Sequence, residues 1–121
     1  MISFKKNKVY YSVSYTDIIK FEGCGNYSKI YCLIDGVIVT GMIYGGLIKL
    51  KLPRAMFFRV NKRYVVNLLY IVKVWDLENN YIGAKDCYGA IYEFSRVKGY
   101  DFKRFIKMGK IVLGMQAQPF V

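Results

Sequence analysis

The sequence contains no histidine, so it lacks the side chain that enzymes use most often as a general base and that proteins use most often to bind transition metals. Nucleophile pairs of the Ser-His or Cys-His type are excluded with it. The three cysteines, Cys24, Cys32 and Cys87, form an odd set without CxxC spacing, which predicts neither a disulfide framework nor a zinc site. We therefore expect a protein that is not an enzyme, that holds no metal or cofactor, and whose thiols are reduced.

Long uncharged segments are also missing. No run approaches the roughly 20 apolar residues that a membrane-spanning helix needs. The first six residues, MISFKK, do not contain the apolar region of a signal peptide. These absences favour a cytoplasmic protein without a membrane partner.

Acidic residues are scarce, because eight Asp and Glu stand against 19 Lys and Arg, and the formal net charge is +11. No acid lies between Gly36 and Trp75, a stretch that contains Lys49, Lys51, Arg54, Arg59, Lys62, Arg63 and Lys73. A second basic block follows at Arg96, Lys98, Lys103, Arg104, Lys107 and Lys110. A single surface lysine commonly serves only solubility, but the exclusion of acids from so long a window exceeds that need. If the fold brings the two blocks together, we expect one basic surface for a polyanion, first of all nucleic acid.

Length and aromatic content indicate the fold class. A chain of 121 residues fits one domain, and an aromatic content of 17% together with many Val and Ile favours β-strands. The pair Asp35-Gly36 is typical of a tight turn and predicts a hairpin around it. We expect a mostly β fold, with strands over residues 8–13, 18–22, 27–33, 37–40, 57–60, 64–66, 70–75, 81–85 and 90–94.

Two short helices are also predicted. In residues 42–52, Ile43, Leu47 and Leu50 lie at the spacing of one helical face, although Gly45-Gly46 costs such a helix about 1 kcal/mol per glycine. Near the end of the chain, Phe102, Phe105 and Ile106 repeat at the same spacing. The last residues, 108–121, are rich in large apolar side chains, and we expect them to pack on the domain or pair with a partner.

Three segments resemble the motifs of LytTR domains, the DNA-binding output modules of many bacterial response regulators. Glu22–Ile30, EGCGNYSKI, resembles E-x-x-G-N-Y-x-K-I. Leu52–Asn67, LPRAMFFRVNKRYVVN, resembles L-P-x-x-F-x-R-I/V-H-R/K-S-Y/F-L/I/V-V-N with one extra residue after the proline. Ile91–Arg96, IYEFSR, is similar to I-P-V/I-S-R. The resemblance covers residues 8–107 in the family's order, and it leaves residues 1–7 as an N-terminal extension and residues 108–121 as an apolar C-terminal extension.

The resemblance implies an elongated domain of small antiparallel sheets with one or two short helices, which binds double-stranded DNA through loops. Carried onto this sequence, the family's contacts fall on Asn26, Ser28 and Lys29 in a first loop, on Lys62 and Asn67 in a second segment, and on Arg96 in a third. Ser28 takes the base-facing position, and the planar guanidinium of Arg96 suits a bidentate contact with guanine. Asn61 and Arg63 stand where the family usually has His and Ser.

The family further implies pairing of two copies head to tail on direct repeats of DNA. The usual receiver domain is not expected in this chain, so a separate sensor protein could regulate it. Two other classes stay open from the residues themselves. The aromatic and basic β surface also fits a module for single-stranded nucleic acid or RNA, which stacks bases on Tyr or Phe. Charge alone also fits an interaction protein or a membrane-surface protein.

Overall fold

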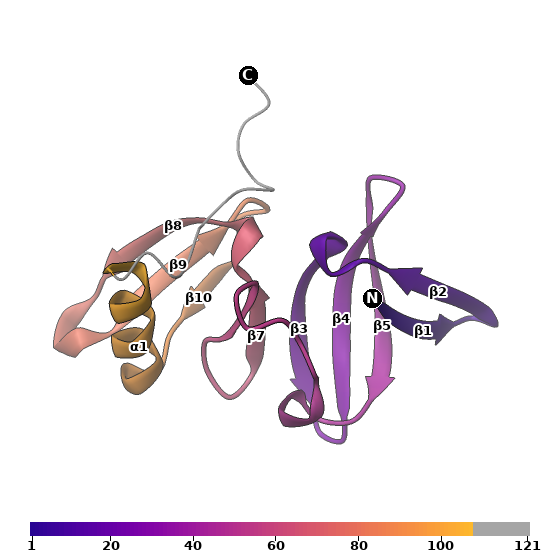
Figure 1. Ribbon diagram of the computed structural model, residues 1–121, viewed down its shortest axis with the longest axis horizontal. Coiled ribbons are helices and arrows are strands. Elements are labelled where there is room, and N and C mark those ends of the chain that lie inside the picture. The colour runs from indigo at the N-terminus through magenta and orange to yellow at the C-terminus, as the bar shows by residue number, and fades with distance from the viewer. Residues whose placement is uncertain (108–121) are drawn as a thin grey trace.

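The computed structural model describes residues 1–107, with the backbone alone for Asn80 and residues 105–107. Over this range the chain forms three small antiparallel sheets and one α-helix, arranged side by side in an elongated molecule (Figure 1). The mostly β prediction is confirmed. The strands are β1 Ile2–Lys6, β2 Val9–Val13, β3 Ile18–Cys24, β4 Tyr27–Ile34, β5 Val37–Tyr44, β6 Phe57–Arg59, β7 Tyr64–Asn67, β8 Ile71–Asp76, β9 Ile82–Asp86 and β10 Ile91–Glu93. The helices are α1 Arg96–Lys107 and the 3-10 turns η1 Tyr15–Asp17, η2 Leu47–Lys49, η3 Leu68–Tyr70 and η4 Glu78–Asn80.

The largest sheet has the strand order β5-β4-β3-β7-β6. The hairpin predicted around Asp35-Gly36 is confirmed as β4 and β5, and both turn residues have positive φ, 52° and 77°. This sheet separates two apolar cores, because neighbouring residues of β7 point to opposite faces. Val65 belongs to one buried cluster, with Phe21, Ile30 and Phe57, and Val66 belongs to the other.

The first core lies between the five-stranded sheet and the β1–β2 hairpin. Residues 1–7, expected as an extension, contain β1, and all five residues of this strand pair with β2. The hairpin attaches to the sheet through Phe4, whose ring covers Gly41 of β5 so closely that a Cβ on Gly41 would lie 2.4 Å from it. Position 41 therefore requires glycine for this contact.

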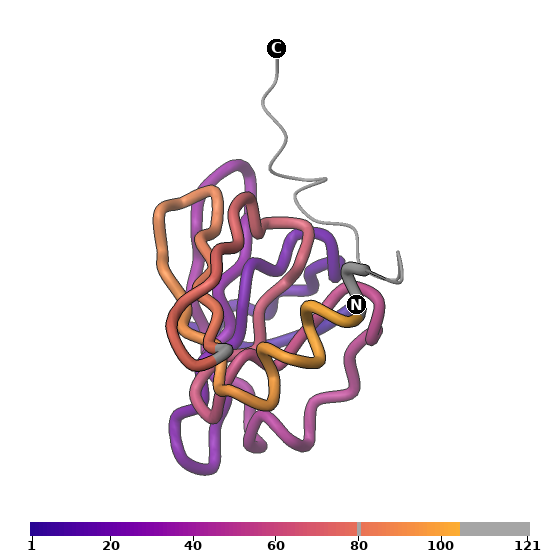
Figure 2. Tube along the Cα trace, turned by 90° about the vertical axis from the view of Figure 1, so that its left-hand side faces the viewer, coloured from indigo at the N-terminus to yellow at the C-terminus, as the bar shows by residue number. Residues whose placement is uncertain are grey.

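The second core lies between three parts of the fold: the sheet of strands β8, β9 and β10, helix α1, and the face of β6 and β7 that points away from the first core. Three phenylalanines form its centre: ring centroids are 4.8 Å apart for Phe94 and Phe102, and 5.2 Å apart for Phe58 and Phe102. Figure 2 shows α1 running along the outside of the strands of this half. The helix predicted around Phe102 is confirmed, and no helix in residues 1–107 has the length and hydropathy to cross a membrane.

The helix predicted over residues 42–52 is wrong. Strand β5 continues to Tyr44, the chain then turns at Gly45 with φ of 113°, and only the short η2 turn follows. The helical spacing has another origin, since Ile43 faces the core from a strand while Leu47 and Leu50 reach the same core from the turn and the segment after it. The chain therefore turns at the glycine pair, and no α-helix forms in this segment. The apolar extension predicted over residues 108–121 lies outside the described part of the chain.

Candidate nucleic-acid interface

Three segments that are far apart in the sequence lie along one edge of the molecule. They are the β3–β4 turn at Gly25-Asn26, the β6–β7 loop over residues 60–63, and the first turn of α1. All three lie toward the lower edge in Figure 1 and again in Figure 2, with η2 between the first two in Figure 1. The three motif segments therefore converge on one face.

The β6–β7 loop is tied to both of its neighbours by hydrogen bonds. On one side the Gly23 backbone N–H donates to the Arg63 carbonyl at 2.7 Å. On the other side the Ser95 N–H donates to the Val60 carbonyl at 2.9 Å, one residue before α1 begins. The spacing of the three segments is therefore set by backbone contacts rather than by mobile side chains.

Asn61 organises this loop, a role that sequence reasoning missed. Its Oδ1 accepts hydrogen bonds from the backbone N–H groups of Arg63 (2.8 Å) and Tyr64 (3.0 Å), and its Nδ2 donates to the Glu93 carbonyl at 2.9 Å. Asn often closes turns in this way, and its place before Lys62-Arg63 in the sequence is the signal that could have indicated it.

Three of the predicted contact residues lie on this edge with exposed side chains: Asn26, Lys62 and Arg96. Within residues 1–107, no hydrogen bond, ion pair or ring contact occupies the side chain of any of the three. An ion pair of Arg96 with Glu93 is thus absent from the described chain. A fourth predicted residue, Lys29, is half-buried on β4, and its ammonium lies 5.1 Å from the centre of the Tyr31 ring.

Lys62 and Arg63 differ in what surrounds their charges. Both lie in the loop before β7 rather than on a strand. The Arg63 guanidinium donates to Glu22 Oε2 through Nε (2.9 Å) and Nη2 (2.7 Å), while the side chain stays 67% exposed. The Glu22 pKa is lowered by the hydrogen bond from the Tyr31 hydroxyl and by Arg63. Because this carboxylate neutralises Arg63, the uncompensated cation of the loop is Lys62.

Two predicted contact residues, Ser28 and Asn67, are fully buried, and their polar atoms are already bonded. Ser28 Oγ donates to the Gly45 carbonyl at 2.8 Å, which fixes the β5–η2 connection beside the β3–β4 turn. Asn67 Nδ2 donates to the carbonyls of Tyr15 (3.1 Å) and Ile18 (2.8 Å), and its Oδ1 accepts from the Leu69 N–H at 2.9 Å. Both side chains support this part of the fold from within, and neither offers an atom to a ligand at the surface.

Lys20 of β3 lies in a cage of three tyrosine rings. The Lys20 ammonium is 4.7 Å from the ring centre of Tyr31, 5.3 Å from that of Tyr64 and 5.1 Å from that of Tyr92. Burial lowers the Lys20 pKa against the opposing effect of Asp86 and Glu22. Burial together with the Glu22 hydrogen bond raises the Tyr31 pKa to about 12. These rings are already in contact with a cation of the protein itself.

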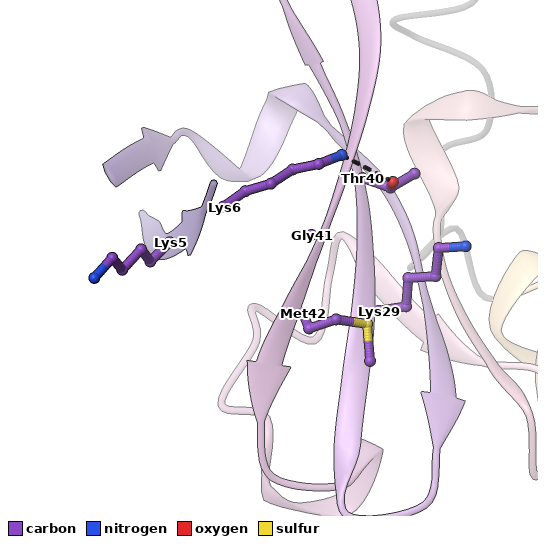
Figure 3. A pocket seen from close by; sticks show the side chains of 6 residues that line it. All are labelled: Lys5, Lys6, Lys29, Thr40, Gly41 and Met42. Carbon is purple, nitrogen blue, oxygen red and sulfur yellow. Dashed lines mark hydrogen bonds between the residues drawn. The ribbon is translucent and has the colours of Figure 1, made fainter. Parts of the chain in front are cut away.

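Three further lysines line a shallow pocket beside β5, but their ammonium groups do not point toward one another. It has a volume of about 220 Å³ and is lined by Lys5, Lys6, Lys29, Thr40, Gly41 and Met42. In Figure 3, Lys6 reaches the Thr40 hydroxyl (3.5 Å), whereas the ammonium groups of Lys5 and Lys29 point away on opposite sides. The pocket therefore does not form an anion-binding site.

No group of three Cys, Asp or Glu side chains that could hold a metal occurs in the described chain.

Comparison with known families identifies the type of domain. The family model of the LytTr DNA-binding domain matches residues 8–107, which include the three segments along this edge. The chain belongs to the LytTR family. Its fold is similar to that of the LytTr DNA-binding domain of a protein described as a methyl-accepting/DNA response regulator from Bacillus cereus, with a TM-score of 0.74 at 15% identity, covering 87% of this chain and 94% of that one. A comparison with curated protein sequences finds no match.

Proposed function

We propose that this LytTR domain regulates transcription in the cytoplasm by binding double-stranded DNA sequence-specifically along the edge formed by the β3–β4 turn, the β6–β7 loop and the start of α1. The observation that carries the proposal is the fixed spacing of these segments, each of which presents an exposed residue that no described group occupies: Asn26, Lys62 and Arg96. Rigid spacing suits a duplex, because its grooves and phosphates recur at fixed intervals.

The three residues have different chemistry, and we assign them different roles. Arg96 carries a planar fork that can pair with guanine O6 and N7 in the major groove. Lys62 is a flexible point charge and suits a phosphate. Asn26 and the half-buried Lys29 lie on or beside the β3–β4 turn, where they contact bases or backbone together. Ser28 and Asn67 are omitted from the contact set because they are buried.

Duplex DNA is favoured over single strands because three aromatic rings behind this edge already contact a cation of the protein. Tyr31, Tyr64 and Tyr92 surround Lys20, whereas Tyr27 packs edge to face on Tyr44 with centroids 5.4 Å apart and stays 45% exposed. A single-strand module instead needs open ring faces for successive bases. Tighter binding to a single strand than to the duplex of the same sequence, lost on Tyr27→Ala without loss of fold, would favour the stacking module instead.

The test begins with selection of bound fragments from random duplex DNA, which reports a sequence motif and whether it is a direct repeat for two copies. Arg96→Ala should weaken the selected site by about 1–3 kcal/mol and relax the preference at one base pair. Lys62→Ala should weaken all sequences alike and reduce the slope of log K against log salt by about 1. Lys85→Ala, an exposed lysine of β9 outside the three segments, is the matched control and should change neither property. A uniform loss in both interface variants with an unchanged motif would refute base reading by Arg96.

A further inference from the structure

Ile48 is the most exposed large hydrophobic side chain in the described part of the chain, at 84%. It lies on η2, next to the exposed Lys49, at the interface edge and not on an outer face of a sheet. An isolated exposed apolar residue needs no explanation by itself. Its position among the cations of the proposed interface is what calls for one.

The backbone that carries Ile48 is held firmly. The residue before it, Leu47, is buried, and its side chain packs so tightly on Gly23 that a Cβ there would lie 3.3 Å from Leu47 Cδ1. The Gly45 N–H donates to the Asn26 carbonyl at 2.7 Å, and Ser28 Oγ donates to the Gly45 carbonyl. The η2 turn is therefore fixed against the β3–β4 turn, and Ile48 projects from this rigid support.

Ile48 also borders an open hollow of about 380 Å³ between η2 and the β6–β7 loop. Three glycines form part of its wall, and Lys62 and Arg59 line its other side: the full lining is Gly23, Gly25, Gly46, Leu47, Ile48, Arg59 and Lys62. Arg59 donates to the carbonyls of Asn61 and Lys62 at 3.1 Å each, which holds its guanidinium in place, whereas the Lys62 ammonium has no partner among the described residues. One rim thus offers an apolar branched chain and the other a positive charge.

This pairing of chemistries matches DNA better than a second copy of the chain. A second copy carries the same +11 charge and would bring like charges together across this edge. In the major groove, DNA combines phosphates with one apolar feature, the C5-methyl group of thymine. Resting on the proposed function, we propose that Ile48 is a specificity-determining residue that contacts a thymine methyl group while Lys62 binds a nearby phosphate.

The test replaces thymines of the selected duplex one at a time by uracil, which removes only the methyl group. With the unaltered protein, uracil at one position should weaken binding about fourfold, the effect of returning one methyl group to water. Ile48→Ala should weaken the thymine duplex by at least as much and should bind the thymine and uracil duplexes equally. Ile48→Val keeps the branched chain and should retain the discrimination. Val37→Ala, at the opposite end of β5 with a side chain 62% exposed, is the matched control and should behave as the unaltered protein does.

Folding does not confound this comparison, because melting temperature is measured for each variant and each serves as its own reference for the two duplexes. Discrimination against uracil that persists in Ile48→Ala overturns the inference while leaving the proposed function intact. Equal binding of all uracil duplexes by the unaltered protein does the same. Failure to prefer any duplex overturns the proposed function and, with it, the role of Ile48.

Discussion

Asn67 provides the sharpest test of whether a motif residue acts at the surface or inside the fold. Replacing it by alanine removes three hydrogen bonds and leaves the Ile18 carbonyl, which lies in a buried environment, without this partner. An unsatisfied buried group costs about 1–3 kcal/mol, and loss of an N-cap such as this one on η3 costs about 1 kcal/mol more. We expect Asn67→Ala to lower the free energy of unfolding by about 2–4 kcal/mol, measured by urea denaturation.

DNA affinity should respond differently. At a temperature and protein concentration at which Asn67→Ala is fully folded by circular dichroism, its affinity for the selected duplex should stay within about twofold of the unaltered protein, since no atom of Asn67 reaches the surface. Arg96→Ala is the matched opposite case, with affinity lost and stability kept. Unchanged unfolding of Asn67→Ala combined with a large loss of affinity would refute this reasoning and return Asn67 to the contact set.

Two further predictions concern the charges inside the domain. Because the Glu22 pKa is lowered, this carboxylate stabilises the fold at pH values above its ordinary pKa, and this contribution is lost as pH falls through the lowered pKa. The melting temperature of the unaltered protein should therefore decrease as the pH falls below about 4. The decrease should be less steep in Glu22→Gln. Burial lowers the Lys20 pKa, which means that the charged form of Lys20 is disfavoured in the cage. Lys20→Met should therefore keep the free energy of unfolding, measured in urea, at or above its original value. A loss greater than about 1 kcal/mol would show that the contacts with the rings outweigh the cost of desolvation.

Nine of the ten strands could be predicted from the sequence because their signals are local, whereas β1 lies in residues 1–7, which were expected to be an extension. The β-prone residues of β4 and β5 and the Asp35-Gly36 turn between them indicate a hairpin without knowledge of the rest of the chain. The helix predicted after β5 was wrong because its signal depended on contacts between separate parts of the chain. Ile43, Leu47 and Leu50 share helical spacing, but they reach one core from a strand and a turn, and periodicity cannot distinguish that arrangement from a helix.

The motif segments could be identified from the sequence, but which of their side chains are exposed could not. Motif order indicated the three segments, and the structure brings them to one edge. Whether a motif residue faces outward depends on register and on partners distant in the sequence: Ser28 pairs with Ile43 on the core face of β4, and Asn67 bonds to carbonyls about fifty positions earlier. Ile48 had no motif to indicate it, because only the three-dimensional structure shows an apolar side chain projecting at a basic edge.

The position of Glu22 shows how a basic edge can include an acid and still suit a polyanion. A free carboxylate there would repel phosphates, but Glu22 is only 12% exposed and receives hydrogen bonds from Tyr31, Arg63 and Tyr64. The pair with Arg63 holds the β6–β7 loop against β3, in the same place where the Gly23 N–H bonds to the Arg63 carbonyl. One of two adjacent cations thus serves the fold, and the other, Lys62, stays available at the surface. An acid at this point therefore compensates one cation of the edge, Arg63, and leaves Lys62 without a compensating acid among the described residues.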